Sequence, residues 1–378
     1  MIPYTRHTIT PDDEAAVRRA LHGPTLTGGP EVEAFEAALG TLTGARHAVA
    51  VASGTAALHL AYTALGVGPT GTLITSPISF VATANAAHYC GTAPLFADVN
   101  PHTGLMDPLA LRRAMPSAPV PVRAVVPVHL GGQAVPLDRL GIAPDAVCIE
   151  DACHALGATW TDLSGVSRAV GSCSHSAAAV FSFHPAKQVA CGEGGAILTN
   201  RDSLAQTLRE LRNHGRATPD SQAAVLGYNY RMPAMSAALG ASQLRRLPES
   251  VAERRRLAAR YDEAFGDVAY ATPVPHDRGS ARHLYQVLLK PYAFRPDVTR
   301  ADVLTALRHR GIGAQVHYLP IHLLPLYRQL DGWTDGAFPL AEAFGAWALT
   351  LPLYPGLTAA EQGQVIGTVH TVCEEYGR

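Results

Sequence analysis

Charged residues are scarce in this chain, and neither sign is in excess. They account for 16% of the 378 residues, and the formal net charge is −1. A protein that binds nucleic acid or an anionic membrane through charge needs a basic surface. The sequence offers no basic run beyond Arg254-Arg255-Arg256, which follows Glu253 in a helical stretch. We therefore expect neither a nucleic-acid partner nor a membrane partner.

Paired cysteines and long apolar segments are also missing. The six cysteines are scattered without a C-x-x-C pair, so the sequence indicates neither a disulfide framework nor a cysteine-based metal site. No apolar run is long enough to span a bilayer, and residues 1–4 resemble neither a signal peptide nor a transit peptide. These absences predict a reduced, cytoplasmic protein.

Hydrophobic residues are abundant, at 47%, and the length exceeds what one core usually supports. From about residue 47, short apolar runs alternate with helical ones. We predict helices at 54–65 and 80–89, and strands at 47–52, 73–76, 94–98, 122–128 and 146–151. Such alternation, with nearly continuous apolar strands, indicates an α/β fold with a mostly parallel sheet flanked by helices.

A different pattern begins after about residue 245. It predicts a helix at 250–265 with Ser250 as its N-cap, a helix at 300–310, and strands at 283–289 and 313–318. We therefore predict a large domain at residues 1–245, which includes an N-terminal arm, and a smaller α+β domain at residues 246–378. A short mobile loop is expected at residues 217–222.

The segment from Phe181 to Gly195 is the most informative for chemistry. It places Lys187 after an apolar strand and before a glycine-rich turn. Burial lowers the pKa of a lysine and favours its neutral, nucleophilic form, which can form a Schiff base. A solvated cation at a strand end is the alternative, and this segment alone does not decide between the two.

Three further positions each have a functional and a structural interpretation. Residues 53–55 (Ser-Gly-Thr) begin a helix, where free N–H groups can bind a phosphate or where a hydroxyl simply caps the helix. Asp151 ends a buried strand and could hold a pyridinium, or a metal together with His154, although no third ligand with suitable spacing is present. A surface acid is the alternative. Phe80 could stack on a planar ligand or belong to the core.

Taken together, these positions match the needs of one cofactor, pyridoxal 5′-phosphate (PLP). Its phosphate needs N–H donors, its ring nitrogen needs a carboxylate, and its aldehyde needs an amine. An aromatic ring can stack on the pyridine. The combination therefore predicts a PLP-binding protein.

A series of segments resembles the DegT/DnrJ/StrS family of sugar aminotransferases. The resemblance implies a fold-type I, aspartate aminotransferase-like PLP-dependent transferase, and it covers nearly the whole chain. The segments are SGTAALHLA (53–61), SFVATANA (79–86), VPVHLGGQ (126–133), IEDACHALGA (149–158), FSFHPAKQVACGEGGAILTN (181–200), LRNHG (211–215), LGYNYRM (226–232) and TLPLYPGLT (350–358).

This resemblance implies a role for each matching residue. Lys187 would be the catalytic residue, forming the Schiff base with PLP and then moving the proton. Asp151 would pair with the ring nitrogen, Phe80 would stack on the ring, and His154 would lie beside it. A lysine at position 187 separates the chain from sugar dehydratases of the family, which have histidine there.

The phosphate would be held by Gly54, Thr55 and Ser182 in this resemblance. Asn229 would reach the phosphate of the neighbouring subunit's cofactor. The resemblance therefore implies a homodimer with active sites shared between subunits.

Within the family, residues 1–10, 24–30 and 315–330 are most similar to the UDP-4-amino-4,6-dideoxy-N-acetyl-β-L-altrosamine transaminases of pseudaminic acid biosynthesis. The implied reaction moves an amino group from L-glutamate to the C4 keto group of a UDP-linked 4-keto-6-deoxy-N-acetylhexosamine. Amination at C3, a dTDP- or GDP-linked sugar, and a non-catalytic PLP-binding regulator are the alternatives. The implied substrate-binding residues are Tyr4, Thr25, Thr27, His317 and Tyr318.

Overall fold

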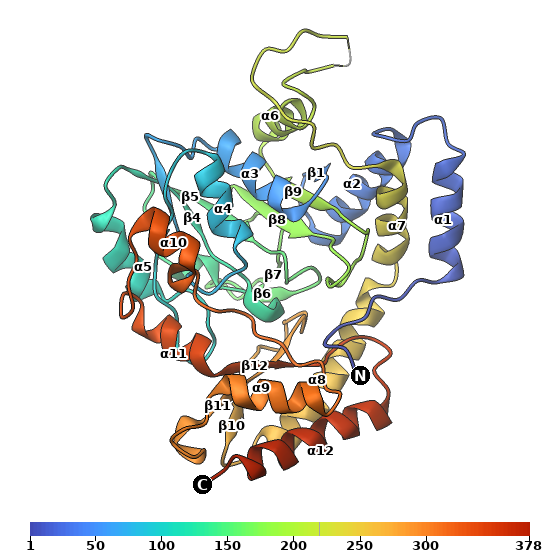
Figure 1. Ribbon diagram of the computed structural model, residues 1–378. Helices are drawn as coiled ribbons and strands as arrows, with labels where there is room; N and C mark the ends of the chain where they lie inside the picture. The colour runs from blue at the N-terminus through green and yellow to red at the C-terminus, as the bar shows by residue number, and fades with distance from the viewer. Residues whose placement is uncertain (219) are drawn as a thin grey trace.

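The computed structural model describes residues 1–218 and 220–378 (Figure 1). The loop predicted at residues 217–222 contains Pro219, so that part of the prediction lies outside the described residues. Two main β-sheets organise the described residues, a larger one built from residues 47–199 and a smaller one built from residues 271–351, and a further two-stranded sheet lies at residues 159–169.

Within the described residues, the larger sheet has seven strands in the order β1–β9–β8–β5–β4–β2–β3. Neighbouring strands from β8 to β3 pair in parallel, whereas β9 is antiparallel to both β1 and β8. The predicted α/β fold with a mostly parallel sheet is therefore confirmed. The strands are β1 (His47–Val51), β2 (Thr72–Thr75), β3 (Leu95–Phe96), β4 (Val122–Val126), β5 (Val147–Asp151), β8 (Ala178–Ser182) and β9 (Gly195–Thr199).

Alternate residues of these strands enter two different hydrophobic cores. In β1, Ala48 and Ala50 pack into the core under one helical layer, whereas Val49 and Val51 pack into the core under the other. Because successive side chains of a strand point to opposite faces, a sheet with apolar residues at every position needs helices on both faces. Figure 1 shows the sheet between these layers, which are α2 (Pro30–Thr43) with α7 (Ala234–Leu244), and α3 (Gly54–Ala64) with α4 (Ala82–Tyr89) and α6 (Asp202–Arg212).

The smaller sheet is antiparallel and has its own core. Val287 and Leu349 belong to this core, and so does Ile2, whose N–H group donates to the Gly311 carbonyl at 2.7 Å. The beginning of the arm therefore packs on the smaller sheet. The predicted domain boundary falls between α7 and α8, and it stays a prediction. The elements are β10 (Ala271–Pro273), β11 (Tyr285–Leu289), β12 (Ala348–Leu351), α8 (Leu247–Phe265), α9 (Arg300–His309) and α12 (Ala359–Glu375).

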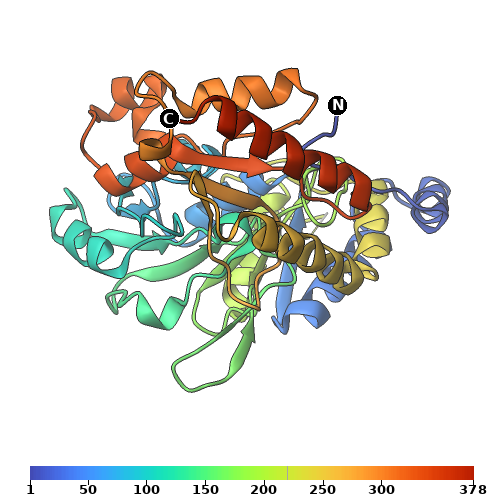
Figure 2. The same cartoon turned by 90° about the horizontal axis from the view of Figure 1, so that it is seen from below.

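Helices α8 and α12 lie side by side on the smaller sheet, which Figure 2 shows from below. The Gln362 side chain of α12 donates to the Leu257 carbonyl of α8 at 2.7 Å. Outside the two sheets' main layers are α1 (Pro11–Leu21), α5 (Pro108–Ala114), α10 (Pro325–Asp331), α11 (Pro339–Trp347) and the hairpin of β6 (Thr159–Thr161) and β7 (Ser167–Ala169). In the described part of the chain, no helix combines the length and apolarity that crossing a membrane requires.

Two local predictions are wrong. Ser250 is not an N-cap: helix α8 begins at Leu247, and the Ser250 N–H group already donates to the Arg246 carbonyl at 3.0 Å. Pro248 sits in the first turn, where a missing N–H group does not matter. Residues 313–318 do not form a strand, because pairing is confined to a bridge between Gln315 and Thr350.

Candidate active site

A cavity of about 390 Å³ opens where several strands of the large sheet end. Asp151 is the last residue of β5, and Ser182 is the last residue of β8. Polar residues at the carboxyl ends of parallel strands meet at one edge of the sheet, where ligands of α/β proteins bind. The predicted site residues that line this cavity are Tyr4, Gly54, Thr55, Phe80, Asp151, His154, Ser182, Lys187, His317 and Tyr318.

The first turn of α3 forms one wall. Ser53 caps the helix, since its Oγ accepts from the Ala56 N–H group at 3.1 Å. Capping still leaves the N–H groups of Gly54 and Thr55 without a carbonyl partner inside the helix. A Cβ atom on Gly54 would lie 2.8 Å from Ser182 Cβ, so glycine allows the helix to approach the end of β8. The wall can thus present N–H and hydroxyl donors to an anion.

A hydrogen-bonded chain fixes the carboxylate of Asp151. This residue is buried, so the surface-acid interpretation is wrong. Its Oδ2 atom accepts from Thr83 Oγ1 at 2.6 Å, and that hydroxyl lies 2.7 Å from Ser79 Oγ. Because Thr83 donates to the carboxylate, it accepts from Ser79. The Oδ1 atom accepts from the Cys153 N–H group at 3.3 Å.

Lys187 follows β8 in a turn, where its N–H group donates to the His184 carbonyl at 2.8 Å. The side chain is half-buried and lines the cavity. Burial lowers the pKa of the Lys187 amine, against an opposing effect of Cys153 and Asp151. A lowered pKa increases the fraction of neutral amine, which is the nucleophilic form.

His154 and Tyr318 form a hydrogen-bonded pair with a defined direction. The Gly131 N–H group donates to His154 Nδ1 at 3.3 Å, so the ring proton of a neutral His154 is on Nε2. Nε2 lies 3.2 Å from Tyr318 Oη and therefore donates to it. Burial lowers the pKa of His154 and raises the pKa of Tyr318, so both are neutral at pH 7. The Tyr318 hydroxyl keeps its own proton to donate to a ligand.

The segment that holds His317 and Tyr318 is anchored on both sheets. His317 Nδ1 lies 3.0 Å from Thr350 Oγ1 on β12, and the His317 carbonyl accepts from Gln286 Nε2 at 2.7 Å. The Ile321 N–H group donates to the Pro77 carbonyl, beyond β2, at 2.8 Å. Burial, and then the charge of Lys187, lowers the pKa of His317 to about 3.

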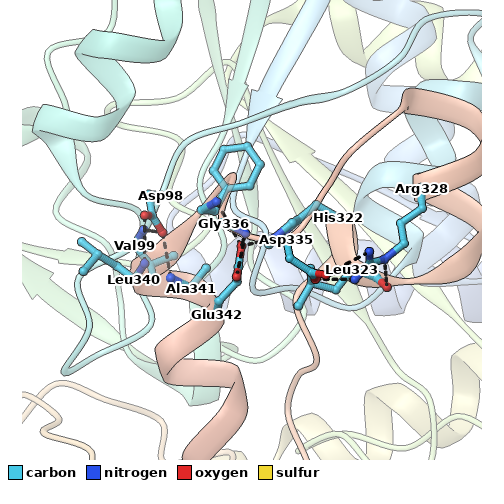
Figure 3. Close-up of polar contacts among 11 residues, drawn as sticks. Asp98, Val99, His322, Leu323, Arg328, Asp335, Gly336, Leu340, Ala341 and Glu342 are labelled. Atoms are coloured by element: carbon cyan, nitrogen blue, oxygen red, sulfur yellow. Dashed lines mark hydrogen bonds and ion pairs between the residues drawn. The ribbon is translucent and has the colours of Figure 1, made fainter.

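Further along this segment, a polar cluster ties it to the large sheet (Figure 3). Asp98, which follows β3, accepts from the N–H groups of Leu340 and Ala341 at 3.1 and 2.8 Å and so caps α11. Glu342 of α11 lies 2.9 Å from His322 Nε2. These contacts hold the backbone downstream of Tyr318 in place.

Three predicted residues lie outside the cavity. Thr25 and Thr27 are exposed on the segment between α1 and α2, and Asn229 is exposed on the loop after α6. The two segments are close together, because Thr27 forms a β-bridge with Pro233. The described chain does not bring these three side chains to its own cavity.

Several lining residues were not predicted as site residues. Ser79 and Thr83 were missed, although their spacing of four places them on one face of a helical turn. His283 also lines the cavity, with its ring centroid 4.5 Å from that of His154 and with Nδ1 buried without a partner among the described residues. In the sequence, nothing distinguishes His283 from the other histidines. No group of three potential metal ligands occurs in the described part of the chain.

The residues present fit PLP. The close approach of Gly54 to Ser182 leaves a cradle of N–H and hydroxyl donors that suits a phosphate. The buried Asp151 carboxylate, already fixed by Thr83, suits a protonated ring nitrogen. The Phe80 ring, 56% exposed, lines the same cavity as Lys187 and presents an apolar face.

Comparisons with known proteins agree with this arrangement. The spore coat polysaccharide biosynthesis protein SpsC of Bacillus subtilis is 36% identical to this chain, over 98% of the chain and 97% of SpsC. A UDP-4-amino-4,6-dideoxy-N-acetyl-β-L-altrosamine transaminase of Campylobacter jejuni is 33% identical, over 99% and 98%. The solved structure of Helicobacter pylori PseC, an aminotransferase of pseudaminic acid biosynthesis, superposes with a TM-score of 0.91 at 31% identity, covering 99% of this chain and 100% of PseC.

The cofactor follows from the same comparisons. The Streptococcus pneumoniae protein Spr1654, which is 27% identical with a TM-score of 0.90 and covers 100% of both chains, has been solved in a PLP form. The family model for DegT/DnrJ/EryC1/StrS aminotransferases matches residues 7–370. The chain therefore belongs to the DegT/DnrJ/EryC1/StrS aminotransferase family and is a PLP-dependent sugar aminotransferase.

Proposed function

We propose that this enzyme transfers an amino group from L-glutamate to the C4 keto group of a UDP-linked 4-keto-6-deoxy-N-acetylhexosamine. The observation that supports it best is one cavity that joins Lys187 and Asp151 to the α3 start and to the residues proposed for the sugar. The similarity to the transaminase of Campylobacter jejuni supports the choice of nucleotide and sugar. Amination at C3, or of a dTDP- or GDP-linked sugar, would use the same cofactor site.

Lys187 is the proposed catalytic residue. PLP, when bound, supplies an electrophilic carbon for the amine and an electron sink for the carbon that loses a proton. The lowered pKa of Lys187 increases the fraction of neutral Nζ amine, the form that would bind the cofactor and then accept and return that proton. Asp151 would receive the ring N–H group, and the Thr83 hydroxyl keeps its carboxylate oriented.

The phosphate would be held by the N–H groups of Gly54 and Thr55 and by the Ser182 hydroxyl. Phe80 would stack on the ring, and His154 would lie beside it and orient Tyr318 through Nε2. In this arrangement the phosphate binds at the side of the cavity formed by the start of α3, and proton transfer takes place at the side formed by Lys187.

The sugar nucleotide would contact Tyr4, His317 and Tyr318. The free proton of the Tyr318 hydroxyl suits a sugar oxygen, and neutral His317 can accept or donate a hydrogen bond without adding charge. The anchoring of this segment to both sheets fixes where these groups stand relative to Lys187.

We propose a homodimer because three proposed ligand contacts lie outside the chain's own cavity. Asn229 would reach the phosphate in the partner's cavity, and Thr25 and Thr27 would reach the partner's sugar. Each of the two segments also exposes a leucine: Leu226 is 85% exposed and Leu26 is 54% exposed. Exposed apolar side chains next to the proposed contacts suit burial against a second copy.

One experiment tests the role of Lys187 directly. The chain contains two lysines, Lys187 and Lys290, and Lys290 Nζ instead donates to the Val268 carbonyl at 2.9 Å. Borohydride reduction of the PLP-loaded protein should attach the cofactor to Lys187, as identified by peptide mass spectrometry. Lys187→Ala should abolish both attachment and glutamate-driven loss of the PLP absorbance, whereas Lys290→Ala should retain both. Attachment to Lys290, or glutamate turnover by Lys187→Ala, would contradict the proposal.

The substrate is tested by a panel of UDP-, dTDP- and GDP-linked 4-keto and 3-keto sugars offered with L-glutamate. Products identified by mass and NMR should show amination at C4 of the UDP sugar. Amination of another member would replace the proposed substrate. Cofactor binding without turnover of any member would favour a regulator.

A further inference from the structure

A second cavity, of about 340 Å³, meets the first at Lys187, which lines both. Its walls come from the N-terminal arm, the turn after β8, the end of α7, the start of α8, and the loop after β12. Lys187 is the one side chain of this cavity's described lining that the proposed cofactor site uses.

The cationic side chain of Arg254 lines this cavity without a carboxylate partner. It is 2% exposed, and its Nη1 atom donates to the carbonyls of His283 and Leu353 at 3.2 and 2.9 Å. Among the described residues, Nε has no partner. Burial lowers the pKa of Arg254 to about 10. A buried guanidinium bonded only to carbonyls is costly unless an anion compensates it.

A second unused donor lies on the neighbouring helix. Gln243 is buried, and its Oε1 atom accepts from the Ala190 N–H group at 2.9 Å, which fixes the orientation of the amide. Its Nε2 group is left without a partner in the described part of the chain. Buried donors are almost always satisfied, so the free Nε2 group of a residue that lines the cavity suits a ligand acceptor, which would reach this covered atom after a small movement of the wall.

The acids that line this cavity leave Arg254 uncompensated. In the described residues these are Glu253, which pairs with Arg256 at 2.7 Å, and Glu249, which is exposed. Arg6 of the arm adds positive charge to the cavity wall. The cavity therefore suits a small anion, and a guanidinium and an amide that line the same cavity suit a carboxylate.

We propose that the second cavity receives the side-chain carboxylate of a dicarboxylic amino donor, with Arg254 and Gln243 as its hydrogen-bond donors. The inference rests on the proposed transfer from L-glutamate and names how that donor is selected. The reacting amine must reach the cofactor at Lys187, and the second cavity begins there. L-Alanine has no side-chain acceptor for these two donors, and the amide of L-glutamine has no charge to compensate Arg254, so both bind more weakly.

The test uses the PLP-loaded enzyme and two readouts. Glutarate, which has both carboxylates but no amine, is titrated by calorimetry, with butyrate and inorganic phosphate as separate arms. L-Glutamate, L-glutamine and L-alanine are compared by the rate at which each converts the PLP absorbance. Glutarate should bind and compete with L-glutamate, whereas butyrate and phosphate should not.

Gln243→Glu is the informative variant, because it keeps the Oε1 acceptor and replaces the donor by a like charge. We expect glutarate binding and the half-saturating concentration of L-glutamate to worsen roughly ten- to hundredfold, with the saturating rate and the L-alanine reaction little changed. Arg254→Lys should act in the same direction. Gln364→Glu, the same exchange at an exposed position of α12, should behave as the wild type.

Unchanged glutarate affinity and L-glutamate saturation in a folded Gln243→Glu variant would overturn the inference while leaving the proposed function intact. Competition by phosphate without binding of glutarate would also overturn it. If no amino acid converts the PLP absorbance of the wild type, the proposed function itself fails.

Discussion

Replacing Gly54 by alanine tests how tightly the start of α3 is held against the large sheet. The added Cβ would lie 2.8 Å from Ser182 Cβ and 3.1 Å from Ser182 Oγ. Carbon atoms in contact normally stand about 3.5–4.0 Å apart, so at least ~0.7 Å of movement is needed.

Neither side can move freely. Ser182 pairs with Gly195 across β8 and β9, and a Cβ on Gly195 would itself collide with the Ser53 carbonyl oxygen. The helix start and the ends of both strands are therefore packed backbone to backbone. Overpacking of this kind typically costs about 1–3 kcal/mol. The added methyl group displaces the N–H groups that are proposed to bind the phosphate. If PLP binding has to reverse this displacement, it costs the same free energy, which corresponds to about a 5- to 150-fold loss of PLP affinity.

The assay is the dissociation constant of PLP, measured by absorbance titration of the cofactor-free protein, with circular dichroism to verify folding. Gly367→Ala is the matched control, because Gly367 is exposed on α12 and a Cβ there would have no neighbour within 4 Å. The control should bind PLP normally and gain up to about 1 kcal/mol of stability. A folded Gly54→Ala protein with wild-type affinity would refute the assignment of this wall to the phosphate.

Further perturbations have defined outcomes. Thr83→Val removes the hydroxyl that donates to Asp151 and should weaken PLP binding about tenfold or more, whereas Thr83→Ser should bind PLP nearly as the wild type. Lys187→Met should raise the melting temperature of the cofactor-free protein at pH 7. The lowered pKa means that the charged form of Lys187 is less favourable in the folded protein than in the unfolded chain, and methionine removes that cost. Burial lowers the pKa values of His276 and His317 to about 3, so the unfolded chain binds more protons below pH 6.5. Urea denaturation at stepped pH should therefore show stability falling from pH 6.5 towards pH 4, by about 1.4 kcal/mol per pH unit for each histidine, and His276→Asn should reduce that slope.

The large sheet was predictable because its strands are buried on both faces. The run at 147–151 is apolar at successive positions and ends in acids, which indicates a central parallel strand ending at a ligand edge. The antiparallel insertion of β9 between β1 and β8 has no such signal, since strand order depends on contacts distant in sequence. The prediction for Ser250 is wrong because serine is acceptable both as an N-cap and in the first turn of a helix. Pro248 favours a helix that begins at Leu247, which places Ser250 inside the first turn.

The cofactor side of the cavity was predictable for a different reason. Lys187, Asp151 and the α3 start each adjoin the end of a strand, so the topology of a parallel sheet brings them together without further information. The substrate side lacks this support. Tyr4 and Tyr318 lie in irregular segments, and only the family resemblance connected them to the site.

The direction of the His154–Tyr318 hydrogen bond could not be obtained from the sequence, and its origin explains why. The tautomer of His154 is set by the Gly131 N–H group, a backbone donor that every non-proline residue has and that no side-chain pattern reveals. Once Nδ1 accepts that bond, Nε2 must donate to Tyr318, and the tyrosine proton is free for a ligand. The position of the Gly131 backbone therefore determines that the Tyr318 hydroxyl donates, rather than accepts, a hydrogen bond toward the proposed sugar site. Substituting His154 by asparagine would remove the Nε2 donor while leaving the sugar-facing hydroxyl in place, so the loss should appear in sugar binding more than in the glutamate half-reaction.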